Sequence, residues 1–176
     1  MSGHNKWSKI KHKKAVTDAK KSQIFSKYAR LIAVESKKTG GDVNAPGLRI
    51  AIEQARGVNM PGDNIKRAVE KGVSGTGDNA EQVTYEAYGP GGAALIIEGL
   101  TDNKNRTAAE IKHLLSQYSL SLAEPRAASW AFEHTQGEWK AKTTTSLSEN
   151  DTEKLATVTE ALSEHDDIHK VHTNAV

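Results

Sequence analysis

The chain has 176 residues, a formal net charge of +2 at pH 7, 36% hydrophobic residues and no cysteine. Without cysteine it has no disulfide bonds or thiolate metal sites, and no apolar run approaches the roughly 20 residues that a membrane-spanning helix needs. Because only 5% of the residues are aromatic, we expect two modest hydrophobic cores rather than one large core. The first residues do not form the apolar segment of a secretory signal, so we expect a cytoplasmic protein.

Positive charge is concentrated at the amino terminus. The first forty residues contain eleven Lys and Arg against two acidic residues, a local charge of +9, so residues 41–176 carry −7. A basic segment on an acidic body attracts a polyanion by Coulomb attraction and by release of condensed counterions, without contacts to bases. This asymmetry predicts a nucleic acid as the partner.

Helical periodicity dominates before residue 80. Apolar residues between Ile24 and Ile32 fall on one stripe, and Thr39-Gly40-Gly41 is expected to end that helix. A second stripe runs from Leu48 to Ala55. A third helix is expected to begin at Pro61, because proline suits the first helical turn, and to end at Gly72.

Strands and helices alternate after the glycine-rich linker at residues 72–79. From Ala93 the predicted order is β-α-β-β-α-β, which is typical of a ferredoxin-like antiparallel sheet with two helices on one face. The predicted fold class is therefore α+β, with a basic three-helix domain over residues 1–78 and a ferredoxin-like domain, with an extra amino-terminal strand, over residues 79–176. The expected strands are 83–88, 93–100, 127–132, 142–147 and 168–173, and the expected helices are 105–118 and 151–163.

Lysines are densest near the amino terminus. Ammonium groups at this density repel one another, which suits a surface that meets phosphates; the alternative is a solvated arm. A tryptophan in this segment can stack on a base, but at a chain start it is more often a packing anchor. The residues predicted to contact nucleic acid here are Lys6, Trp7, Lys9, Lys11, Lys13 and Lys14, followed on the first helix by Lys20, Lys21 and Lys27.

Two loops that open helices carry further cations. Lys66 and Arg67 follow the turn at Asn59-Met60-Pro61, and Lys104 and Arg106 lie in the turn from Thr101 to Thr107. Free backbone N–H groups at a helix start can hold a phosphate. Helix capping by Asn59 and by Asn105 is the favoured interpretation of these two turns, and anion binding is the second.

No catalytic or metal-binding constellation is evident. The segment Gly89-Pro90-Gly91-Gly92 lacks the ending of a P-loop and joins two strands. His165, His169 and His172 straddle a break between helix and strand, so surface histidines are expected, and the acidic residues at 164, 166 and 167 are expected to form a solvated face. These patterns predict a protein that is not an enzyme and has no metal, cofactor or small-molecule substrate.

Five motifs are spread in order over nearly the whole chain. They are Gly3-His4-Asn5-Lys6-Trp7-Ser8-Lys9-Ile10-Lys11-His12-Lys13-Lys14, Asn59-Met60-Pro61 with Asp63-Asn64-Ile65, Tyr85-Glu86-Ala87-Tyr88-Gly89-Pro90-Gly91-Gly92, Thr101-Asp102-Asn103-Lys104-Asn105-Arg106-Thr107 and Trp130-Ala131-Phe132-Glu133. Together these motifs resemble the YebC/PmpR family. The resemblance implies a DNA-binding transcriptional regulator without catalytic activity; mitochondrial and some bacterial relatives are translation factors that act at the ribosome.

The chain departs from this family in one large feature. Family members usually have three domains, the third inserted into the second. Here Phe132-Glu133-His134 leads through residues 136–139 almost directly to Lys142-Thr143-Thr144, which resembles the return to the second domain. A domain-sized piece is therefore expected to be missing. Gly62 also replaces a basic residue that is common after the Met-Pro, which weakens that phosphate contact.

The expected function is a DNA-binding regulator of gene expression with low sequence specificity. If roughly five phosphates of duplex DNA are neutralised, log affinity should fall with log salt at a slope of about −4.5. One alternative is a ribosome-associated translation factor that binds ribosomal RNA, which the same lysines fit equally well. Another alternative is a protein-interaction module with no nucleic-acid role.

Overall fold

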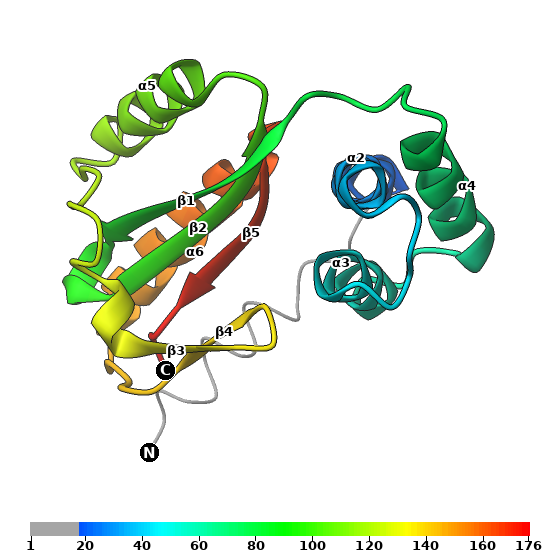
Figure 1. Ribbon diagram of the computed structural model, residues 1–176. Helices are drawn as coiled ribbons and strands as arrows, with labels where there is room; N and C mark the ends of the chain where they lie inside the picture. The colour runs from blue at the N-terminus through cyan, green and yellow to red at the C-terminus, as the bar shows by residue number, and fades with distance from the viewer. Residues whose placement is uncertain (1–17) are drawn as a thin grey trace. The chain divides into compact units, whose positions relative to one another are not determined.

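The computed structural model describes residues 18–176, which form two compact units (Figure 1). The helical unit comprises residues 18–81 together with Leu100–Asp102, and the α/β unit comprises Gln82–Gly99 and Asn103–Val176. The mixed α+β class predicted from the sequence is confirmed, with helices first and a β-α-β-β-α-β order of elements after them. The division between residues 78 and 79 stays a prediction.

Three helices make up the described part of the helical unit: α2 (Asp18–Thr39), α3 (Pro46–Gly57) and α4 (Gly62–Val73). The helix α2 ends where predicted, because Gly40 and Gly41 have φ values of 63° and 83°, which glycine adopts without steric cost. The apolar stripes meet in one core, whose largest buried members include Leu31, Ile32, Leu48, Ile52 and Ile65.

The helix α4 ends at Val73, one residue after the predicted end at Gly72. A Cβ atom at Gly72 would lie 2.4 Å from the carbonyl oxygen of Ala33 and 2.5 Å from Cβ of Ser36. The Ser36 hydroxyl donates to the carbonyl of Val69 at 2.7 Å. Gly72 is therefore a close-packing residue between α2 and α4, in addition to lying one residue before the end of the helix.

The α/β unit has a three-stranded sheet in the order β1 (Glu81–Tyr88), β2 (Ala94–Thr101), β5 (Ile168–Thr173). β2 and β5 are antiparallel, with Leu95 opposite Thr173 and Ile97 opposite Val171. The short 3-10 helix η1 (Pro90–Gly92) joins β1 to β2.

Two helices, α5 (Lys104–Ser116) and α6 (Glu149–Glu164), pack on one face of this sheet. The core on that face contains Leu95 and Ile97 from β2, Ile111 and Leu115 from α5, and Leu155, Val158 and Leu162 from α6. Because successive side chains of a strand point to opposite faces, every second residue of the continuous apolar run in β2 faces the helices.

The opposite face of the sheet is partly covered by a separate hairpin. The hairpin consists of β3 (Phe132–Thr135) and β4 (Glu138–Ala141), preceded by the 3-10 helix η2 (Ser129–Ala131). Ala94 and Ile96 of β2 pack against Ala128, Ala131 and Phe132 in a small core of their own.

The hairpin corrects two strand predictions. Residues 127–131 form a turn and η2 instead of a strand, and β3 starts only at Phe132. Residues 142–147 lie outside the named strands, with Thr145 in an isolated bridge to Ala175. These segments are held by side chains that are distant in sequence. The Asn174 amide donates to the carbonyl of Thr143 at 3.0 Å, and Glu86 of β1 accepts the backbone N–H groups of residues 126, 128 and 129.

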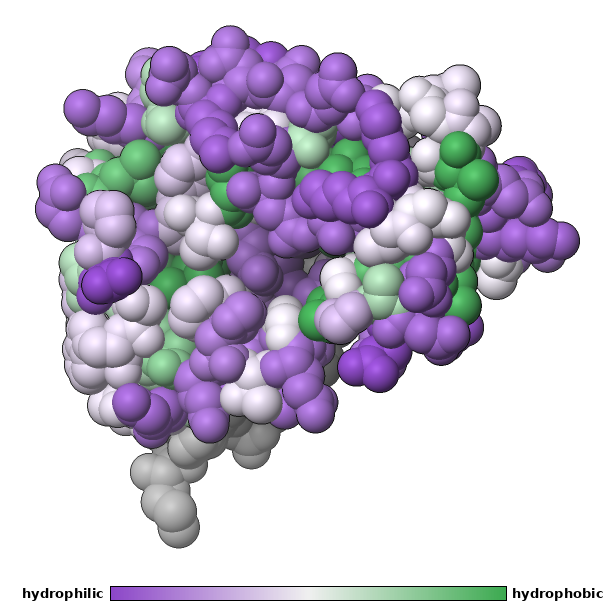
Figure 2. Space-filling model, in the orientation of Figure 1, coloured by the Kyte–Doolittle hydropathy of each residue, from purple (hydrophilic) through white to green (hydrophobic). Residues whose placement is uncertain are grey.

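Hydrophilic residues cover most of the face shown in Figure 2, as expected for a mean hydropathy of −0.61. Among residues 18–176, no helix is both long enough and apolar enough to cross a membrane.

Candidate nucleic-acid interface

The predicted contacts at the amino terminus, Lys6, Trp7, Lys9, Lys11, Lys13 and Lys14, lie outside the described residues. The next three, Lys20, Lys21 and Lys27, lie in the first ten residues of α2. Lys21 is exposed, whereas Lys20 and Lys27 are half-buried. Lys21 is thus the most accessible of these three cations.

The adjacent residues Lys66 and Arg67 face different grooves. Arg67 lines a groove of about 490 Å³ between α2 and α4, and Lys66 lines one of about 620 Å³ between α3 and α4. Because an α-helix turns by 100° per residue, neighbours in sequence point to different sides. Lys66 also lies 4.0 Å from Glu70, an exposed pair that contributes little to stability.

The α2–α4 groove presents polar and cationic side chains along one side of α4. Asn64, Arg67 and Lys71 all line it, at spacings of three and four residues that place them on one helix face. Within the described part of the chain, neither Arg67 nor Lys71 is held by a side-chain hydrogen bond or ion pair. Their charges are therefore available to an anion in the groove.

A third cation of the α2–α4 groove is occupied by the protein itself. Arg30 of α2 forms an ion pair with Asp78 and donates to the carbonyl of Leu100 at 3.2 Å. The groove lining thus contains three cations and one carboxylate, Asp78, and the carboxylate is already matched. A positive charge remains on the α4 side.

The turn before α4 differs from the predicted cap. Asn59 has a φ of 62° and lies before the helix, whose N-cap position is occupied by Pro61 without a side-chain hydrogen bond. The helix begins at Gly62, so Pro61 precedes the first turn. The prediction that Asn59 caps this helix is therefore wrong. Asn59 lies two residues before the N-cap position, and its backbone is in the left-handed region.

The turn before α5 is capped by Asn103 rather than by Asn105. The Asn103 side chain accepts the backbone N–H of Arg106 at 3.1 Å, while Asn105 lies inside the helix. Of the two predicted cations, Lys104 is exposed, but the guanidinium of Arg106 lies 2.8 Å from a carboxylate oxygen of Asp167. Arg106 is thus engaged by an internal partner.

Asp167 is buried, so the prediction of a solvated acidic face is wrong for this residue, whereas Glu164 and Asp166 are exposed as predicted. Besides Arg106, it accepts the hydroxyl of Thr107 at 2.7 Å. Burial raises the pKa of the Tyr85 phenol, and the negative charge of Asp167 raises that pKa further. Because Arg106 and Thr107 lie in the first turn of α5, the buried Asp167 carboxylate stabilises the start of this helix.

The histidines separate into two different settings. His165 lies within hydrogen-bond distance of Glu110, at 2.9 Å, and accepts the N–H of Asp167 at its Nδ1 atom. His172 contacts Glu98 at 2.6 Å instead. The side chains of His165 and His172 are only 15% and 10% exposed, so the predicted surface location is wrong for both. Around Asp167, the polar side chains of Arg106, Thr107 and His165 are thus engaged in hydrogen bonds or ion pairs within the protein.

Sequence reasoning missed Lys71, which completes the row on α4. The signal was present in the spacing of Asn64, Arg67 and Lys71, which matches one face of a helix. The sequence alone does not show that this face of α4 borders α2. Together, fold and site define a two-part α+β protein whose helical unit has a cationic groove.

The chain belongs to the TACO1/YebC family. Residues 5–75 match the model of the TACO1/YebC protein N-terminal domain, and residues 80–137 match that of the TACO1/YebC second and third domain. The second match ends at Gly137, in the two-residue turn between β3 and β4. This turn lies where the resemblance predicted a missing insertion.

Similar proteins come from several bacteria. Those of Thermosipho africanus and Thermotoga maritima are each 52% identical over 135 residues, which is 76% of this chain and 54% or 53% of the relative. Both are named "Probable transcriptional regulatory protein". The chain thus spans about half the length of the relatives that it matches.

The fold is similar to that of a protein whose structure has been solved. The crystal structure of a conserved hypothetical protein, Aq1575, from Aquifex aeolicus matches with a TM-score of 0.77 and 29% sequence identity. The match covers 97% of this chain and 96% of that chain. The arrangement of helices and strands described above is therefore shared with that protein.

Proposed function

We propose that the chain is a non-enzymatic regulator of gene expression that binds DNA through its basic helical unit. The observation that carries this proposal is the α2–α4 groove, where Arg67 and Lys71 offer charges one helical turn apart beside Asn64. The names of the relatives support the regulatory role. Further contacts to phosphates are proposed for Lys21, Lys20, Lys27, Lys66 and Lys104 and for the amino-terminal residues Lys6, Trp7, Lys9, Lys11, Lys13 and Lys14.

Cations on a helix face hold a nucleic acid mainly by its phosphates. Side chains four residues apart have Cβ atoms about 5–6 Å from each other, so Arg67 and Lys71 act as a pair on one stretch of backbone. Phosphate contacts position a protein but carry no sequence information. We therefore expect binding that depends steeply on salt and weakly on sequence.

The second candidate function is a ribosome-associated translation factor that binds ribosomal RNA. The observation that favours it is the placement of the cations in a groove between helices, where they meet a phosphate backbone rather than the edges of bases. Structured RNA is recognised largely by shape and backbone contacts. The two candidates therefore differ in the nucleic acid that binds more tightly.

Fluorescence anisotropy with labelled duplex DNA and with a labelled RNA hairpin tests the groove. Arg67→Ala combined with Lys71→Ala should flatten the plot of log affinity for DNA against log salt by about 1.8 units, because two phosphate contacts are lost. The matched control combines Lys112→Ala with Lys154→Ala, which removes two exposed charges from α5 and α6.

An unchanged slope in the groove variant, or an equal change in the control, would contradict the assignment of the groove. The comparison of ligands separates the two functions. Tighter binding of the duplex at matched salt supports the DNA-binding regulator, whereas tighter binding of the hairpin supports the translation factor.

A further inference from the structure

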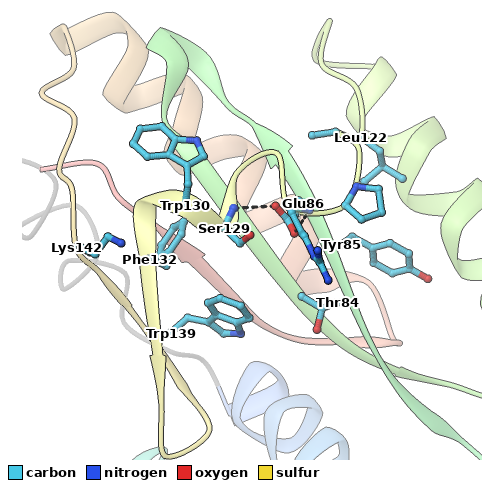
Figure 3. Close-up of a pocket in the computed structure, with 12 residues that line it drawn as sticks. Thr84, Tyr85, Glu86, Leu122, Ser129, Trp130, Phe132, Trp139 and Lys142 are labelled. Carbon is cyan, nitrogen blue, oxygen red and sulfur yellow. Dashed lines mark hydrogen bonds between the residues drawn. The ribbon is translucent and has the colours of Figure 1, made fainter.

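A third pocket lies in the α/β unit, on the sheet face opposite α5 and α6. Its volume is about 670 Å³, within the range of about 300–1,000 Å³ that is typical of ligand sites. Thr84 and Glu86 of β1 form one side, and the segment before β3 and the hairpin β3–β4 form the rest (Figure 3). The aromatic members of the hairpin side are Trp130, Phe132 and Trp139.

The tryptophan rings are held in place without being buried. Trp130 is 54% exposed, yet its indole Nε1 donates to the Tyr88 hydroxyl at 2.8 Å. Trp139 is half-buried and stacks on His134, with ring centroids 4.3 Å apart and planes 25° apart. An exposed tryptophan in a defined orientation offers a flat face to a planar ligand.

The frame around the rings is preformed. The Glu86 carboxylate accepts the backbone N–H groups of Arg126, Ala128 and Ser129 at 2.8, 2.7 and 2.8 Å. The Tyr88 hydroxyl donates to the carbonyl of Ala127. Because β1 fixes this loop by four hydrogen bonds, little ordering is needed when a ligand enters.

The charge of the pocket is positive. Arg126 and Lys142 line it and are exposed, and in the described part of the chain no hydrogen bond or ion pair holds either side-chain charge. The negative charge of Glu86 is matched by the three N–H groups. Flat aromatic faces beside unmatched cations suit an anion that carries planar rings. An apolar peptide fits less well, because the pocket is open and cationic.

We infer that this pocket binds an unpaired nucleotide of a single-stranded nucleic acid, with a base stacked on Trp130 and phosphates near Lys142 and Arg126. Stacking of bases on aromatic residues next to cations is how single strands are held without sequence preference. This site is separate in sequence from the α2–α4 groove and goes beyond the proposed function. It gives the protein a means to hold unstacked bases, which a duplex does not present.

The test uses the full chain and a fluorescein-labelled dT12 oligonucleotide. Trp130→Ala should weaken binding of dT12 by about 5-fold to 150-fold at every salt concentration, since one stacked base is lost. Trp130→Phe should retain most of the affinity, because it keeps a stacking face. The matched control is Tyr118→Ala, which removes another exposed aromatic side chain, 37% exposed, from the same unit.

Cation variants give an independent readout. Lys142→Gln should flatten the salt dependence for the single strand by about 0.7 units, and Lys140→Gln, an exposed control on β4, should not. The duplex affinity of Trp130→Ala should stay unchanged, whereas that of the Arg67→Ala and Lys71→Ala double variant falls. The measurements of single-strand and duplex binding thus test the two proposals independently.

Several results would overturn the inference. These are equal dT12 affinity in Trp130→Ala and the unmodified chain, an equal loss in Tyr118→Ala, or a parallel loss of duplex binding in Trp130→Ala. Binding of free AMP at the pocket as tightly as dT12 would assign it to a mononucleotide instead. Thermal unfolding followed by circular dichroism confirms that each variant is folded before binding is compared.

Discussion

At the scale of single residues, cations with similar sequence surroundings have different roles. Arg106 is matched by Asp167, 61 residues away, and Arg30 by Asp78, 48 residues away. Arg67 and Lys71 have no such partner within the described chain. Only the free cations can contribute fully to phosphate binding, because an engaged guanidinium must first give up its carboxylate.

Glu98 is a residue whose ionisation stabilises the fold. Burial raises the pKa of Glu98, but the hydrogen bond and charge of His172, with the charges of His169 and Lys170, outweigh burial and leave the pKa below its ordinary value of 4.5. A lowered pKa in the folded state means that stability is gained above the unfolded pKa and lost as pH falls through the folded pKa.

Glu98→Gln should therefore reduce the free energy of unfolding at pH 7 by about 1.5–3 kcal/mol, the usual contribution of a hydrogen bond to a charged group. It should also remove part of the loss of stability below pH 4.5. Urea titrations between pH 3 and pH 7 measure both effects. Glu133→Gln, at an exposed position on β3, is the control; an equal loss in both variants would contradict the role of Glu98.

At the scale of elements, local patterns placed the helices better than the short strands. The helices α2, α3, α4, α5 and α6 lie within a few residues of their predicted positions, because each has an apolar stripe of several turns. β3 and β4 each have four residues, too few to show a period. Their position depends on the loop that Glu86 holds, which no local pattern reveals.

The packing of α4 on α2 depends on Gly72. Gly72→Ala should lower the free energy of unfolding by about 1–3 kcal/mol, because the added methyl group overlaps Ala33 and Ser36. The cost of this overlap exceeds the gain in helix propensity. Gly62→Ala is the matched control, since a Cβ there meets nothing within 4 Å. Urea denaturation distinguishes them; equal stability of both variants would show that α2 and α4 adjust freely.

At the scale of the whole molecule, the chain contributes to the helical unit twice. Residues 18–81 form its helices, and Leu100–Asp102 return to it from the end of β2. Leu100 is only 3% exposed and belongs to the core of the helices. A boundary at residue 78 leaves out this second segment, because the apolar pattern of the sequence places Leu100 in the strand 93–100 and shows nothing of its contacts with the helices.

Leu100→Ala should therefore destabilise the helices rather than the sheet, by about 2–5 kcal/mol. Hydrogen exchange followed by mass spectrometry should show faster exchange in α2 and α4. Ile97→Ala, three residues earlier and fully buried, should instead accelerate exchange in α5 and α6, because Ile97 belongs to the other core. Unchanged protection of α2 and α4 in Leu100→Ala would contradict the division into units.

The sequence by itself determined the α+β class, the main helices, the strands β1, β2 and β5 and the family, because these depend on local periodicity and on contiguous motifs. Tertiary structure alone decided which cations stay available, where the hairpin lies and how the tryptophans border a cationic pocket. Those features arise from contacts between residues tens of positions apart, such as Glu86 with the loop before β3 and Asp167 with Arg106. Such contacts depend on how elements pack, and a linear pattern of residue types does not encode their distances.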